Sequence, residues 1–307
     1  MQEIDKVIIN FDEGQMVLLN ICLGFLMFGV ALDLSFKDFR KIFKKPKPVF
    51  LGLTSQLVLL PIFTLLFIFI VQPPFSIQLG MLLIATCPGG NISNYMVHRS
   101  HGNTALSITL TSVVTLAAVL ITPVSFYLWT QLLEVPSDLA RIIKVDFLSM
   151  MKIIVQLIVV PLALGMVLRR YLPEVTARII KPVKWISVLL LLGIIFFALK
   201  GNTEIIRSHL HHVFYLVLAH NGLAYVIGYY FARKTGLSVS DARAIAIETG
   251  IQNGGLALIL IFNYFQGLGG MALVAAWWGV WDIISGFALS SYWVRRPVGS
   301  RPVFGAE

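Results

Sequence analysis

The chain has 307 residues, of which 57% are hydrophobic and 13% are charged, and its mean hydropathy is +0.84. Soluble domains carry about 25% charged residues, so this composition excludes an ordinary water-soluble protein. The net charge of +9 comes from basic residues between long apolar runs, a distribution typical of membrane-protein loops and not of a nucleic-acid-binding face. We therefore predict an all-α polytopic protein whose surroundings are the lipid bilayer.

Nine apolar stretches satisfy the requirement of about 20 residues for a helix that crosses the bilayer. In chain order they are residues 15–34, 48–71, 77–97, 104–130, 147–168, 183–199, 213–231, 242–264 and 269–294. With the N-terminus outside, 18 Lys and Arg residues lie in cytoplasmic segments and 5 in outer ones. The positive-inside rule therefore predicts nine transmembrane helices, an outer N-terminus and a cytoplasmic C-terminus.

Two of these spans contain residues that interrupt a helix. The third span carries CPGGNISN, with a break expected near residues 88–94, and the eighth carries ETGIQNGG, with a break near 249–255. The two motifs can be aligned, and so can spans two and seven, over a shift of five spans that inverts the repeat. A Gly/Pro kink would explain one break alone. Two breaks at matching positions are typical of an alternating-access transporter with its site near the midplane.

Oxygen-bearing residues gather at both breaks, and hard cations prefer oxygen ligands. The first candidate cation site comprises Ser93, Asn94, Ser107, Thr111 and Glu248, and the second comprises Gln56, Glu248, Gln252 and the carbonyls of Thr249 and Ile251. An ionisable residue within a span costs roughly 2.5–3.5 kcal/mol, so Glu248 is expected to face an ion, water or protein. The alternatives are a buried structural acid for Glu248 and a helix-packing pair for Ser107 and Thr111.

Two bound cations that share one carboxylate leave the site positive, which favours an anionic cargo. The candidate substrate residues are Asn91, Asn94, Asn253 and Asp282. Asp282 could line the cavity, take part in proton linkage or have a structural role. The histidines at 209, 211 and 212 are placed in a loop, and no histidine cluster has the spacing of a transition-metal site. We expect no cofactor besides two coupling ions, and the usual enzyme motifs are absent from the sequence.

Three stretches resemble the bile acid:sodium symporter family, which includes bacterial homologues of the mammalian bile acid transporters. They are FLMFGVALDLSFKDFRKIFKKPKPVFLGLTSQLVLLP, CPGGNISNYMVHRSHGNTALSITLTSVVT and AIETGIQNGGLALIL. The resemblance implies sodium at both candidate sites and a bacterial inner membrane. Some bacterial relatives have ten spans where this chain has nine. The last span has Asp282 followed by isoleucine where relatives carry a His-Asn pair.

The resemblance also implies a core domain that contains the broken helices and a panel domain beside it. The expected segments are an extracytoplasmic N-terminus at 1–14, panel helices of the first repeat at 15–71, core helices of the first repeat at 76–131, an intervening helix and panel helices of the second repeat at 144–231, core helices of the second repeat at 238–294, and a cytoplasmic tail at 295–307.

The predicted function is sodium-coupled import of an organic anion, either bile-acid-like or a small carboxylate. A proton-coupled transporter or a uniporter of the same fold is the nearest alternative, and a membrane receptor or channel comes from another class. The cargo, the ion stoichiometry, the resting conformation and any oligomeric partner stay open.

Overall fold

The computed structural model describes residues 3–9, 13–32, 46–90, 92–134, 136, 148, 151–152, 155–200 and 203–296. The basic segment at 33–45, Asn91, the segment 137–147 and the C-terminal residues 297–307 lie outside the described residues. Within the described ranges the regular structure is helical, and two isolated β-bridges are the only extended pairings. The predicted all-α class is confirmed for this part of the chain.

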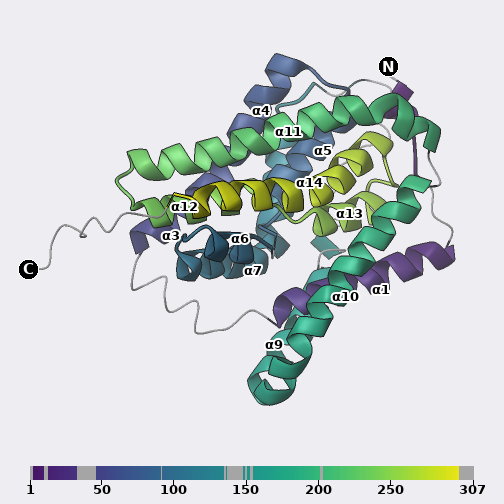
Figure 1. The fold of residues 1–307 in the computed structure, drawn as a ribbon. Coiled ribbons are helices and arrows are strands. Elements are labelled where there is room, and N and C mark those ends of the chain that lie inside the picture. The colour runs from purple at the N-terminus through teal and green to yellow at the C-terminus, as the bar shows by residue number, and fades with distance from the viewer. Residues whose placement is uncertain are drawn as a thin grey trace, which may run out of the picture.

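The helices run in chain order as Figure 1 shows. In the first half they are η1 (Glu3–Lys6), α1 (Glu13–Ala31), α3 (Pro46–Thr54), η2 (Ser55–Leu59), α4 (Leu60–Val71), α5 (Phe75–Thr86), α6 (Ile92–Arg99) and α7 (Thr104–Thr130). In the second half they are η3 (Val155–Val159), α9 (Val160–Tyr171), α10 (Pro173–Lys200), α11 (Thr203–Lys234), α12 (Val239–Gly250), α13 (Gly254–Asn263) and α14 (Gly269–Val294).

Four helices of the described residues are long and apolar enough to cross a membrane. They are Pro46–Val71, Thr104–Thr130, Val213–Lys234 and Gly269–Val294. Phe75–Thr86 and Gly254–Asn263 are apolar but short, because each is one half of an interrupted span. The total of nine spans and the orientation of the termini stay predictions.

An interruption is present in each span in which the sequence predicts one. The first lies between α5 and α6, at residues 87–91, and the second lies between α12 and α13, at residues 251–253. The proline and glycine residues of the first interruption end α5, because proline lacks the N–H that continues a helix. Both breaks fall within or overlap the ranges expected from the motifs.

The two breaks lie against each other and pair through their backbones. The Gly90 N–H donates to the carbonyl of Ile251 at 3.1 Å, and the Asn253 N–H donates to the carbonyl of Pro88 at 2.8 Å. An antiparallel bridge joins Gly89 to Gln252 between these two bonds. The pairing satisfies backbone groups that have no partner in a helix, which a buried break requires.

The packing of the helices differs from the expected division into panel and core. Helices α1, α9 and α10 pack mainly against one another and lie together at one side of the molecule (Figure 1). The helices of residues 46–71 and 203–234, expected in the panel, instead pack with α5, α7, α12 and α14. The reason is that these two segments carry buried polar side chains whose partners lie in the interrupted spans, such as Ser55, Gln56 and Asn221.

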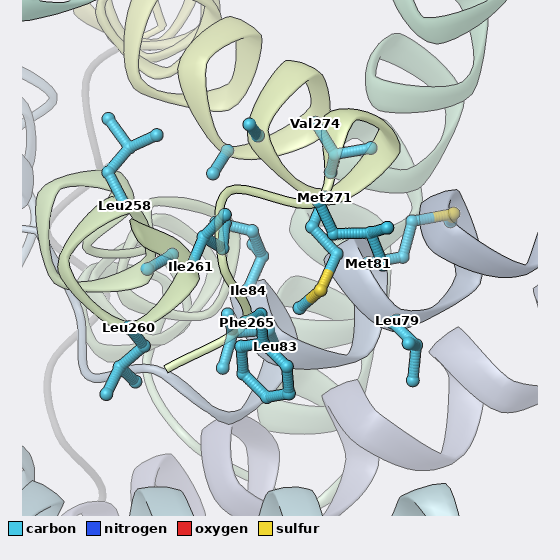
Figure 2. Packing of buried hydrophobic residues seen from close by; sticks show 14 of the residues in the cluster. Leu79, Met81, Leu83, Ile84, Leu258, Leu260, Ile261, Phe265, Met271 and Val274 are labelled. Carbon is cyan, nitrogen blue, oxygen red and sulfur yellow. The ribbon is translucent and has the colours of Figure 1, made fainter. Parts of the chain in front are cut away.

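The largest apolar core forms among α5, α13 and α14. Figure 2 shows Leu83 and Ile84 of α5 beside Ile261 of α13 and Met271 of α14, and all four side chains are fully buried. Both α5 and α13 are apolar on every side, as expected for half-helices that other helices surround. This packing holds one half of each interrupted span in place beside the site.

The N-terminal arm, residues 3–9, ties the beginning of α5 to the turn between α13 and α14. Asp5 Oδ1 accepts hydrogen bonds from the backbone N–H of Ser76 at 2.8 Å and from its hydroxyl at 2.6 Å. The Ile9 N–H donates to the carbonyl of Gly267 at 2.8 Å. Gly267 has φ of +72°, a conformation that favours glycine.

The histidines at 209, 211 and 212 do not lie in a loop. Helix α11 begins at Thr203 and includes all three of them. The prediction was wrong because it equated polar sequence with a loop, whereas the polar turns at the beginning of α11 continue a helix of 32 residues.

Candidate cation-binding site

Glu248 lies near the end of α12, and its side chain is 1% exposed. Ser93 of α6 and Ser107 of α7 each donate a hydroxyl hydrogen bond to Oε1 at 2.5 Å, and Thr111 of α7 donates to Oε2 at 2.9 Å. Ser107 and Thr111 reach the same carboxylate because residues four apart share one face of a helix. Three helices therefore converge on one buried carboxylate, and hydroxyls are its side-chain partners among the described residues.

Asn94 adds an amide oxygen to this group, which we call the hydroxyl cluster (Ser93, Asn94, Ser107, Thr111 and the Glu248 carboxylate). Its Oδ1 accepts from Ser107 at 2.8 Å and from Thr111 at 3.5 Å. A carboxylate offers about four lone-pair sites and an amide oxygen two, whereas each of the three hydroxyls has one hydrogen to donate. The hydroxyl cluster thus has more acceptors than donors, which is the chemistry of a cation site.

A second group lies on the other side of Glu248, and we call it the amide cluster (Gln56, Gln252 and the carbonyls of Glu248, Thr249 and Ile251). Gln56 Nε2 donates to the Glu248 carbonyl at 3.1 Å, and Gln252 Nε2 donates to the Thr249 carbonyl at 2.9 Å. The Oε1 atoms of both glutamines are buried and lack a hydrogen-bond partner. Two buried, unpaired oxygens are costly unless another group binds them, and a cation is such a group.

The carbonyls of Thr249 and Ile251 were expected to be freed by the break, but both accept a hydrogen bond. Gln252 Nε2 bonds to the first, and the Gly90 N–H bonds to the second. The crossing of the two breaks explains the bond to Ile251, whereas the bond to Thr249 comes from a side chain of the same break. A carbonyl has two lone pairs, so one remains on each of these oxygens.

The π-helical segment η2 brings Gln56 to the amide cluster. It spans Ser55–Leu59 and is followed by Pro61 at the beginning of α4. In a regular α-helix the proline ring would clash with the carbonyl four residues earlier, and a π-turn widens the helix at that place. Ser55, in the same segment, shares a hydrogen bond of 2.8 Å with the Thr249 hydroxyl. Sequence reasoning missed Ser55.

Gly89 lies where the hydroxyl cluster and the amide cluster meet. A Cβ on this residue would lie 3.0 Å from Gln56 Nε2 and 3.0 Å from Glu248 Oε2. These contacts show that the two side chains approach the same point of the first break from two sides. Only glycine allows the backbone to come so near both groups.

The four residues predicted to bind substrate do not gather in one place. Asn94 belongs to the hydroxyl cluster, and Asn91 lies outside the described residues. Asn253 Oδ1 accepts from the Leu256 N–H at 2.9 Å and so caps the N-terminus of α13. Asp282 Oδ2 accepts from the backbone N–H of Gln252 at 3.1 Å. The last two side chains therefore hold the second break in the structure.

Asn221 of α11 is a site residue that sequence reasoning missed. Its Nδ2 donates to the carbonyl of Gly250 at 2.8 Å and to Asp282 Oδ1 at 3.3 Å. The available signal was an asparagine beside His220 within an apolar span that the repeat alignment had matched to span two.

Comparison with known proteins identifies the family of this chain. The model of the Sodium Bile acid symporter family matches residues 20–209. The uncharacterized sodium-dependent transporter YocS of Bacillus subtilis is 31% identical over 91% of the chain and 83% of its own length. The probable chloroplastic sodium/metabolite cotransporters BASS2 of Oryza sativa and BASS5 of Arabidopsis thaliana are 28% and 31% identical.

The matches to BASS2 and BASS5 cover 91% and 80% of this chain, but only 64% and 60% of those longer proteins. The family model and the Bacillus relative both cover most of the chain, and both describe sodium-dependent transport. The matching family is one of transporters, and the apolar helices of the chain indicate an integral membrane protein. The chain therefore belongs to the sodium bile acid symporter family.

Proposed function

We propose that this protein is a sodium-coupled symporter that imports an organic anion across the bacterial inner membrane by alternating access. The observation that carries the proposal is the buried Glu248 carboxylate, which receives hydroxyls from two other helices. A carboxylate within a membrane protein needs a compensating charge, and oxygen-only surroundings suit an alkali cation better than a basic side chain.

Two sodium ions are proposed, one on each side of Glu248. The hydroxyl cluster would bind the first through Ser93, Asn94, Ser107, Thr111 and the Glu248 carboxylate. The amide cluster would bind the second through Gln56, Glu248, Gln252 and the carbonyls of Thr249 and Ile251. The unpaired Oε1 atoms of the two glutamines support the second site, since both are oxygen ligands without another partner.

The cargo is proposed to be a monoanion, either bile-acid-like or a small carboxylate. Two sodium ions and one glutamate leave a net positive charge beside the breaks, and the N-termini of α6 and α13 add partial positive charge there. Asn91 and Asn94 of the first break, with Asn253 of the second, would contact it. Import with two sodium ions moves one net charge, which couples uptake to the membrane potential at about 2.3 kcal/mol per 100 mV.

The proposed movement is between the group of α1, α9 and α10 and the remaining helices. The first group packs mainly within itself, whereas both breaks belong to the second. A displacement of one group against the other would expose the breaks to each side of the membrane in turn, as in transporters built from inverted repeats.

The test is uptake into proteoliposomes that hold the purified protein. A panel of labelled bile acids and small carboxylates is offered with an inward sodium gradient, and with potassium in its place. We expect one class of anion to accumulate only with sodium. Glu248→Ala should abolish this uptake while the protein stays monodisperse in detergent, and Glu174→Ala, which removes an exposed glutamate, should not.

Other outcomes identify other functions. Accumulation that follows a pH gradient and ignores sodium would identify a proton-coupled transporter, and equilibration without either gradient a uniporter. Ligand binding without accumulation would indicate a receptor, and ion flux without cargo a channel. Each of these results would refute sodium symport.

A further inference from the structure

The second break is held by two buried side chains from neighbouring helices. Asn221 of α11 donates to the carbonyl of Gly250, the last residue of α12, and Asp282 of α14 accepts from the backbone N–H of Gln252. The two side chains also contact each other, with Asn221 Nδ2 at 3.3 Å from Asp282 Oδ1. They are 1% and 3% exposed, so the pair lies inside the protein.

The described residues of the first break have only half of this arrangement. The Thr122 hydroxyl of α7 donates to the carbonyl of Thr86, the last residue of α5, at 2.9 Å. This bond corresponds to the one from Asn221 to Gly250. The N–H groups of Gly90 and Asn253 are satisfied by the opposite break. Among the described backbone groups of the two breaks, the N–H of Gln252 is the one that donates a hydrogen bond to a carboxylate.

Both oxygens of Asp282 are engaged with the protein. Oδ1 faces Asn221 and Oδ2 faces the Gln252 backbone. An acid placed for cargo would direct a free oxygen toward a cavity, whereas this one binds the broken backbone of α12 and α13. The geometry therefore indicates that Asp282 holds the second break, through Asn221 and Gln252, and does not contact the cargo.

The groups proposed for the second sodium ion lie within the stretch that the pair holds. Asn221 fixes the carbonyl of Gly250 and Asp282 fixes the N–H of Gln252, so the peptide groups on both sides of Ile251 are restrained. Thr249, Ile251 and Gln252 belong to this stretch. Ion ligands must be held within about 0.5 Å of their productive positions, which is the usual role of such supporting bonds.

We infer that Asn221 and Asp282 are positioning residues for the second sodium site and do not bind the cargo. This inference rests on the proposed function, because it presumes that the amide cluster binds sodium. It identifies Asn221 as part of the coupling machinery and gives Asp282 a role in ion affinity.

The experiment measures the sodium response without any cargo. The melting temperature of the detergent-purified protein is followed while NaCl replaces KCl at constant total salt. A ligand at free concentration c that binds the folded state stabilises it by RT ln(1 + c/Kd), so fitting the curve gives the sodium concentration at which half of the folded protein has bound sodium, which we call the half-maximal sodium concentration. The variants are Asn221→Leu, Asp282→Ala and Asp282→Asn.

Asn20→Leu is the control. Asn20 of α1 and Asn263 at the end of α13 exchange two amide hydrogen bonds of 3.1 and 2.8 Å, and this polar contact between helices does not involve Asn221, Asp282 or the second break. Loss of a bond that orients a metal ligand typically lowers metal affinity by 10- to 100-fold. We expect the half-maximal sodium concentration to rise by about 10- to 100-fold in the three variants, and by less than about twofold in the control.

A purely structural role would lower the melting temperature in KCl and leave the half-maximal sodium concentration unchanged, and that result would overturn the inference. If Asp282→Ala does not yield folded protein, Asp282→Asn decides. It keeps the side-chain volume and an acceptor for Gln252, but it loses the charge and presents a donor to Asn221. If wild-type protein shows no sodium response at all, the proposed function fails and not this inference alone.

Discussion

Replacing Glu248 with glutamine removes the charge of the hydroxyl cluster and keeps the length and volume of the side chain. Ser93 and Ser107 can still donate to an amide oxygen at the position of Oε1, while the Thr111 hydroxyl must turn to accept from the new NH₂ group. A buried carboxylate pays a desolvation cost that the amide avoids. In potassium the variant should therefore be at least as stable as the wild type.

In sodium the order should reverse. Removing one partner of a buried charge pair costs about 3–5 kcal/mol, and 1.4 kcal/mol corresponds to a factor of ten, so sodium affinity should fall between about 10²- and 10⁴-fold. The assay is binding of radiolabelled sodium to the purified protein. We expect two ions per wild-type chain. Glu248→Gln should lose the ion of the hydroxyl cluster and bind the ion of the amide cluster more weakly, because it removes the charge that lies between the two sites but keeps the backbone carbonyl.

Glu174→Gln is the control, since Glu174 is exposed at the beginning of α10. It should bind sodium as the wild type does. If Glu248→Gln retains wild-type sodium affinity, the carboxylate does not coordinate the ion and the reasoning from the hydroxyl cluster is refuted.

Gly89→Ala should lower sodium affinity by about tenfold. The Cβ of the alanine would lie 3.0 Å from Gln56 Nε2 and 3.0 Å from Glu248 Oε2, so both side chains would have to move by tenths of an ångström. Unchanged sodium binding would contradict this prediction. Asn20→Ala should lower the melting temperature by a few degrees, since Asn20 of α1 and Asn263 of α13 exchange two amide bonds of 3.1 and 2.8 Å, each worth about 0.5–1.5 kcal/mol. The double variant with Asn263→Ala should be no less stable than the single ones; additive losses would show that the amides act independently.

The parts that could be predicted from the sequence are those that depend on residue type within an apolar span. Pro88 and the glycines after it cannot continue a helix, so the first break was predictable. Glu248 and Ser93 are polar residues that lipid does not accept and that lie in the two aligned motifs, so their convergence could be inferred, and Ser107 could be added because it lies four residues before Thr111 on one face of the next span. The structure places these three side chains in contact.

The parts that could not be predicted depend on contacts between distant segments. The π-turn at Ser55 changes which side of the helix faces Thr249, and hydrophobic periodicity does not reveal it. The pairing of the two breaks uses backbone groups, which every sequence has. Asn221 could not be assigned before the packing of α11 against α12 was known, and the same packing moved this helix from the expected panel to the core.

Glu248 contributes its carboxylate to one cluster and its backbone carbonyl to the other. Under the proposed mechanism, an ion that orders this residue on one side also prepares the other side. Linkage is reciprocal, so each ion should raise the affinity for its neighbour by the same factor. Sodium activation should therefore be sigmoidal, with a Hill coefficient above one, and a variant that disables either cluster should reduce it to one.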